Sequence, residues 1–171
     1  MTVTDHHLPV IARRPPRPVR YGIGAVLVVA AIHLIALALV ITHRDVLTAA
    51  VAAAHPTWSS GRVDQVASSE FWSTLIPHIL LPIVFVARAR ALRSGRRRTR
   101  TIITALLGLQ LLAHATLPLQ LQLFPGYGPW IIGVQAVSFV FEASTIYLLW
   151  RSPEARDFFA STPNPAARAA A

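Results

Sequence analysis

The chain has 171 residues, of which 54% are hydrophobic and 13% are charged, whereas soluble domains average about 45–50% and 25%. It has no cysteine, which excludes disulfides, thiolate metal sites and a cysteine nucleophile. Its formal net charge is +9, and the charged residues collect between long apolar blocks, so we expect membrane-spanning helices and not a soluble domain with one core.

The first apolar block covers residues 21–42 and carries no formal charge. At 1.5 Å per residue, about twenty residues match a hydrocarbon layer about 30 Å thick. A cleavable signal peptide is the alternative, but its apolar region is only about 7–15 residues long. We therefore predict a first membrane span here. Residues 1–20, which include ARRPPRP, are predicted to be a disordered cytoplasmic tail.

The second block, residues 71–90, contains Pro77 and Pro82, which we expect to bend the span. Arg88 and Arg90 can extend it by reaching the membrane interface. The external segment before it, residues 43–69, is expected to hold a short helix capped by Asp45, followed by a break at PTWSSG.

The third and fourth blocks, residues 101–124 and 130–150, are separated by the turn sequence PGYGP. One face of the third block carries mainly small residues and is expected to pack closely against another helix; it comprises Thr101, Thr104, Gly108, Leu112 and Ala115. Residues 151–171 are predicted to be a cytoplasmic amphipathic segment and tail. In that segment Ser152 would be the N-cap of a short helix, and Phe158 and Phe159 would lie among the lipid headgroups.

The arginines predict the orientation of the chain. With the N-terminus inside, fourteen of the sixteen arginines lie on the cytoplasmic side, and only Arg44 and Arg62 lie outside. This asymmetry is a strong positive-inside signal and predicts that both termini are cytoplasmic. Seven arginines between the second and third spans set this topology and are expected to meet anionic lipid headgroups: Arg88, Arg90, Arg93, Arg96, Arg97, Arg98 and Arg100. Nucleic acid is the alternative partner, but this loop has no aromatic residue, so we expect none to bind.

Together these features predict an all-α polytopic membrane protein, with four transmembrane helices in an up-down bundle over residues 21–150. The loop ALRSGRRRTR and the closing stretch LLWRSPEARDFF resemble those of small uncharacterised four-span membrane proteins of GC-rich bacteria. The resemblance implies an integral protein of the bacterial cytoplasmic (inner) membrane and implies no catalytic residue.

The candidate functional residues are ionisable side chains within the predicted spans. His33, His78, His114 and Glu142 lie one on each span, and ionisable groups at such depths face the bundle interior or a cavity. At 1.5 Å per residue, they lie about 10 to 18 Å from the outer ends of their spans, so they can meet in one layer. Gln110 shares a face with His114, and Gln135 begins a polar stripe on the fourth span that continues through Glu142.

Four roles fit this polar cluster. The favoured role is structural, with neutral histidines and a protonated Glu142 hydrogen-bonded across helices. Alternatively, His78 and His114 could ligate haem b. The three imidazoles and the carboxylate could bind a divalent metal, or Glu142 and a histidine could relay protons. We therefore expect a non-enzymatic accessory, interaction or structural protein without a cofactor, whose partners are the bilayer, anionic lipids and another membrane protein or a second copy of itself.

Overall fold

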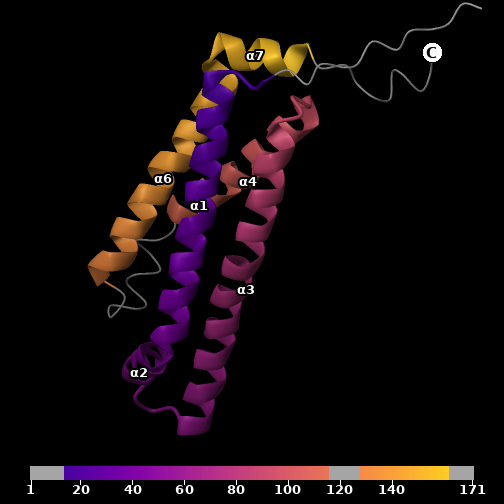
Figure 1. The fold of residues 1–171 in the computed structure, drawn as a ribbon. Coiled ribbons are helices and arrows are strands. Elements are labelled where there is room, and N and C mark those ends of the chain that lie inside the picture. The colour runs from indigo at the N-terminus through magenta and orange to yellow at the C-terminus, as the bar shows by residue number, and fades with distance from the viewer. Residues whose placement is uncertain (1–13, 116–127, 162–171) are drawn as a thin grey trace, which may run out of the picture.

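The computed structural model describes residues 14–115 and 128–161, and every regular element within these ranges is helical. The elements are α1 (Arg17–Thr42), α2 (Arg44–Ala54), α3 (Ser60–Leu92), α4 (Arg97–Ala115), α6 (Gly128–Arg151) and α7 (Pro153–Ala160) (Figure 1). The all-α prediction is thus confirmed for the described residues.

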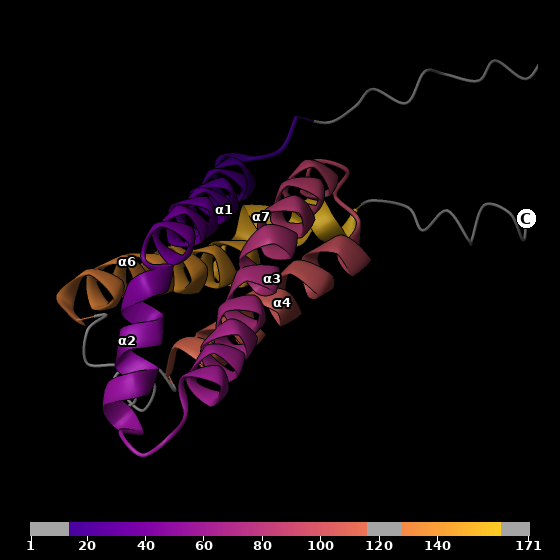
Figure 2. The same ribbon diagram turned by 90° about the horizontal axis from the view of Figure 1, so that it is seen from below.

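Four helices run side by side around a common core. α1 contacts α3 and α6, and α4 contacts the same two helices from the other side, so α1 and α4 lie at opposite corners of the bundle (Figure 2). The short helix α7 crosses one end, where α1 begins and α3 turns into α4, while α2 lies at the opposite end (Figure 1). The arginine-rich turn and both described chain ends therefore share one end of the molecule.

Among the described residues, three helical segments are long and apolar enough to cross a membrane: Arg17–Thr42, Ser60–Leu92 and Ile132–Arg151. The third predicted span, residues 101–124, is described only up to Ala115, where α4 ends, and residues 116–124 lie outside the described part of the chain. Its described part begins with Arg97, Arg98 and Arg100, which lower its mean hydropathy.

All four long helices begin earlier than the predicted spans; α4 begins at Arg97 and not at residue 101, and α6 begins at Gly128 and not at residue 130. α1 begins at Arg17 and not at residue 21, because Pro18 lies in the first turn, where a proline costs no hydrogen bond. α3 begins at Ser60 and not at residue 71, and it continues through Pro77 and Pro82 to Leu92. With 33 residues it is about 50 Å long at 1.5 Å per residue, which exceeds the hydrocarbon thickness of about 30 Å.

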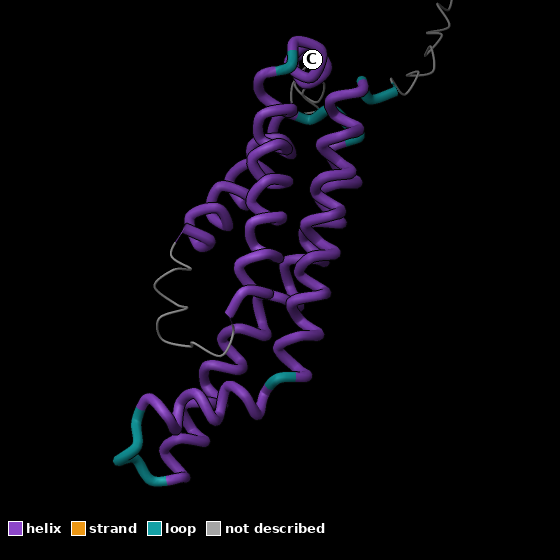
Figure 3. Tube along the Cα trace, turned by 90° about the vertical axis from the view of Figure 1, so that its left-hand side faces the viewer, coloured by secondary structure: helices purple, strands orange, loops and turns teal. Residues whose placement is uncertain are grey.

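The early part of α3 is held by α2, which the sequence predicted as a short helix. The N-cap of α2 is His43 and not Asp45, which lies in the first turn. Apolar side chains of α1, α2 and α3 form a separate cluster here, comprising Val40, Leu47, Val51, Val63, Ala67, Phe71 and Leu75. The α2–α3 loop forms the far tip of this end (Figure 3).

The main core lies between α1, α3, α4 and α6 and includes Val26, Phe85, Leu107 and Leu149, each fully buried. Most of the expected small-residue face of α4 is exposed in the described structure, although Thr104 contacts Trp150 of α6. A Cβ at Gly108 would meet nothing within 4 Å, and Leu112 is 65% exposed. The face points outward because α4 directs Ile103 and Leu107 inward instead.

Candidate functional site

A buried polar contact joins α1 to α4 near the middle of the bundle. The amide nitrogen of Gln110 donates to His33 Nε2 at 2.7 Å, and both side chains are buried. The His33 ring stacks on Phe85 with centroids 5.7 Å apart, and its other neighbour is His78, whose ring meets it edge-on at 5.2 Å. His78 Nδ1 in turn bonds the carbonyl of Thr74 at 2.7 Å.

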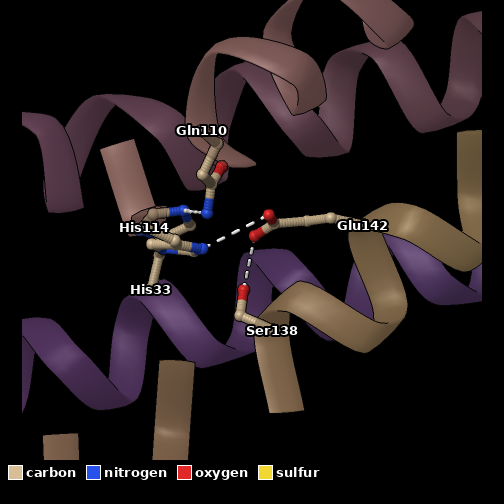
Figure 4. A network of polar contacts seen from close by, with 5 residues as sticks. All are labelled: His33, Gln110, His114, Ser138 and Glu142. Atoms are coloured by element: carbon tan, nitrogen blue, oxygen red, sulfur yellow. Dashed lines mark hydrogen bonds and ion pairs between the residues drawn. The ribbon is translucent and has the colours of Figure 1, made fainter. Parts of the chain in front are cut away.

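A second buried contact joins α4 to α6. Glu142 is fully buried, and its Oε1 accepts a hydrogen bond from Ser138 at 2.6 Å. His114 Nδ1 approaches Glu142 Oε2 to 3.3 Å, but neither atom completes a well-aligned hydrogen bond. We therefore treat this contact as an electrostatic one. Figure 4 shows the side chains of His33, Gln110, His114, Ser138 and Glu142 converging from α1, α4 and α6. We call these five residues the polar network.

Helical spacing explains why these residues meet. Gln110 and His114 are four residues apart on α4, and so are Ser138 and Glu142 on α6, so each pair lies on one face of its helix. Because all four side chains face the core, two polar faces meet across the α4–α6 contact. Gln135 is half-buried, and its Oε1 is buried without a hydrogen-bond partner. No hydrogen bond between described residues joins it to the polar network.

The positions of the described histidines and of Glu142 differ in how well they suit a metal site, a haem site and a proton relay. No group of three or more histidine, aspartate or glutamate side chains among residues 14–115 and 128–161 is arranged to hold a metal ion. The imidazole that His78 touches is that of His33, whereas a bis-histidine haem site would need it to pair with His114 across the iron. By contrast, a carboxyl beside an imidazole is a pair between which a proton can move.

A second cluster of polar contacts lies at the arginine-rich end. The α3–α4 turn passes through Gly95, whose φ of 68° is the left-handed conformation that favours glycine. Arg97 Nε donates to the carbonyl of Phe159 in the last turn of α7 at 3.3 Å. The Arg100 guanidinium lies 3.9 Å from the centroid of the Trp150 ring and 5.2 Å from that of Phe159. Of the seven predicted topogenic arginines, only Arg88 and Arg100 are half-buried.

The helix α7 begins as predicted, with Ser152 as its N-cap, accepting from the Ala155 backbone N–H at 3.2 Å. The expected placement of its aromatic residues among lipid headgroups is wrong for Phe159. That side chain is fully buried in the main core, and Phe158 packs partly against the same core. The physical reason is that the aromatic face of α7 covers the ends of the other helices and the Arg100 side chain.

No pattern in the sequence indicated the contact between Arg100 and Trp150. These residues are fifty positions apart, and no periodicity links them. Trp150 Nε1 donates to Thr104 Oγ1 at 2.7 Å, which fixes the indole ring against α4. Burial, and secondarily the charge of Arg97, lower the pKa of the Arg100 guanidinium.

Comparison with protein-family models, with curated proteins and with solved structures found no match for this chain. Its function is therefore argued from its own geometry.

Proposed function

We propose that this chain is a four-span protein of the bacterial cytoplasmic membrane, with both termini on the cytoplasmic side. In this proposal it has no catalytic role and serves as a structural or accessory component. Its polar network sets the position of α4 in the bundle. Support for the membrane placement comes from large apolar side chains on the outer faces of the helices. Leu34, Ile83, Leu109 and Val140 are examples, and they are 54–66% exposed.

One observation carries the structural role: each interhelical side-chain hydrogen bond or ion pair described above has a partner on α4. Gln110 bonds α1, His114 approaches α6, Thr104 accepts from α6, and Arg97 donates to α7. Lipid tails are as apolar as leucine, so apolar burial alone does not hold helices together in a membrane. Polar contacts of this kind select one position and one rotation of α4 among the other helices.

The topology is tested by cysteine labelling, because the native chain contains no cysteine. Single cysteines are introduced as Ser59→Cys, Ser94→Cys, Gly128→Cys and Ser161→Cys. A membrane-impermeant thiol reagent applied to intact spheroplasts is expected to label the first and third variants only. Labelling of Gly128→Cys solely after permeabilisation would mean that α4 does not cross the membrane, and the four-span proposal would fail.

A proton relay is the second candidate, and the contact between His114 and Glu142 favours it. A charged side chain at the centre of a bilayer costs about 2.5–3.5 kcal/mol or more, so a buried carboxyl there is neutral or paired with a cation. Either state lets one proton be shared between Glu142 and His114. Ser138 donates to Glu142 at 2.6 Å and so orients the carboxyl beside His114.

The two candidates differ in their response to Glu142→Gln, which keeps the shape of the side chain but cannot ionise. Purified protein is reconstituted into vesicles containing a pH-sensitive dye, and a potassium gradient with valinomycin supplies the driving force. A structural role predicts no proton flux above that of empty vesicles for either protein. A relay predicts flux in the wild type that Glu142→Gln abolishes and that Gln135→Leu, outside the polar network, leaves unchanged.

A further inference from the structure

The arginine-rich end carries a large excess of positive charge that the protein does not neutralise. Twelve described arginines lie at this end, on α1, α3, α4, α6 and α7 or beside them, together with only two carboxylates, Glu154 and Asp157. No ion pair between described residues includes an arginine. Glu154 instead accepts a hydrogen bond from Ser152 at 2.7 Å.

Within this excess, one arginine is held in a fixed position. The Arg100 guanidinium lies against Trp150 and Phe159, and the indole is itself anchored by its bond to Thr104. Arg100 Nε and Nη1 are buried and have no hydrogen-bond acceptor among the described residues. A cation that is partly buried without a negative partner is costly, so an anion bound beside the guanidinium from outside the chain would stabilise this arrangement electrostatically.

Neighbouring groups add to the attraction for an anion. Arg97 lies one turn before Arg100, and its Nε bond to Phe159 holds it at the same end of α4. The first turn of α4 contains no acidic residue, although the N-terminus of a helix carries partial positive charge and favours one. An oxyanion at this end can accept hydrogen bonds from the exposed Arg97 side chain and interact with the positive charge of Arg100.

We propose that Arg97 and Arg100, with Trp150 and Phe159 as their aromatic support, form a binding site for the phosphate of one anionic phospholipid in the cytoplasmic leaflet. A lipid is favoured over a soluble anion because a tryptophan at the end of a span marks the depth of the membrane interface, where lipid phosphates are concentrated. The proposal rests on the cytoplasmic placement proposed above. It goes further than charge attraction, because it assigns the binding to two of the seven arginines in the loop region, Arg97 and Arg100.

The test measures binding of phosphatidylglycerol to the full-length protein in detergent by native mass spectrometry. Arg100→Gln is compared with Arg93→Gln, which removes the same charge from an exposed position in the same loop. We expect Arg100→Gln to weaken phosphatidylglycerol binding at least tenfold and Arg93→Gln to weaken it less than twofold. Arg100→Lys, which keeps the charge but loses the planar group that stacks on Trp150, should weaken it severalfold. If circular dichroism shows that Arg100→Gln does not fold, Arg100→Lys takes its place in the comparison with Arg93→Gln.

Three results would overturn the proposal. Equal weakening by the Arg93 and Arg100 variants would show diffuse attraction without a site. Equal binding of phosphatidylcholine would show that the anionic lipid is not selected, and displacement of phosphatidylglycerol by equimolar inorganic phosphate would identify a soluble anion as the occupant. Detergent binding does not depend on orientation, whereas cysteine labelling does, so failure of the lipid site and failure of the proposed topology are told apart.

Discussion

The contact between His33 and Gln110 offers the sharpest test of the idea that polar contacts position α4. His33→Leu removes the acceptor of the Gln110 amide nitrogen, whose 2.7 Å bond is the direct link between α1 and α4. Gln110 Oε1 already lacks a partner, so this variant leaves the whole buried amide unsatisfied. Gln110→Leu likewise leaves His33 Nε2 without its donor. Replacing both residues by leucine removes every polar atom of the pair.

The magnitude follows from the kind of bond. An unsatisfied buried polar group costs about 1–3 kcal/mol in soluble proteins, whereas interhelical hydrogen bonds in membranes average about 0.6 and reach about 1.7 kcal/mol. We therefore expect a coupling energy of about 0.6–1.7 kcal/mol, with the double variant more stable than the sum of the single effects predicts. Loss of the ring contacts of His33 with Phe85 and His78 occurs in both His33 variants and cancels in the cycle.

The assay is reversible unfolding in mixed micelles, in which the fraction of a denaturing detergent is raised and helicity is followed by circular dichroism. Thr145→Val combined with His33→Leu is the control cycle, because the Thr145 hydroxyl bonds the Phe141 carbonyl of its own helix at 2.7 Å. That pair should be additive within about 0.5 kcal/mol. If the His33 and Gln110 variants are equally additive, the bond does not position α4 and the reasoning fails.

Two further predictions concern other parts of the chain. The hydrogen bond that Ser152 donates lowers the pKa of Glu154, and a backbone hydrogen bond contributes less. At a pH above the usual glutamate pKa of 4.5, the ionised carboxylate therefore stabilises the start of α7. This stabilisation is lost as the pH falls through the lowered pKa. The protection of α7 amides against hydrogen exchange, corrected for the pH dependence of the intrinsic exchange rate, should therefore fall in acid, and Glu154→Gln should remove that fall. A Cβ at Gly22 would lie 3.2 Å from Leu149 Cδ2, whereas one at Gly24 would meet nothing within 4 Å. In the unfolding assay Gly24→Ala should thus gain up to about 1 kcal/mol from helix propensity, and Gly22→Ala should gain less or lose stability; equal effects would show that Gly22 has no packing role.

Helical periodicity predicted which polar residues face the core, because one sequence interval corresponds to one direction around a helix. Ser138, Glu142 and Thr145 are buried as their spacing indicates. The choice of partners was not predictable in this way. Gln110 bonds His33 and not Glu142 because of the order and rotation of the helices around the bundle, and these depend on contacts between residues far apart in the chain.

The early start of α3 did leave a signal in the sequence. Val63, Ala67, Phe71 and Leu75 are spaced by four residues and form one apolar stripe. The polar residues between them lower the hydropathy of this segment, so hydropathy alone does not indicate a helix there. The stripe is stable as a helix because α2 folds back onto it, and the presence of that partner is a tertiary feature.

The contacts of α4 lie at two heights, and this separation has a structural consequence. Thr104 and Arg100 meet Trp150 near one end, while Gln110 and His114 meet α1 and α6 deeper in the bundle. From Thr104 to Gln110 the rise is about 9 Å at 1.5 Å per residue. A single contact would leave a helix free to pivot, whereas two contacts at different heights fix both its tilt and its rotation. The described part of α4 buries few apolar side chains of its own. Removing the polar contacts at either height should therefore loosen this helix before any other in the bundle.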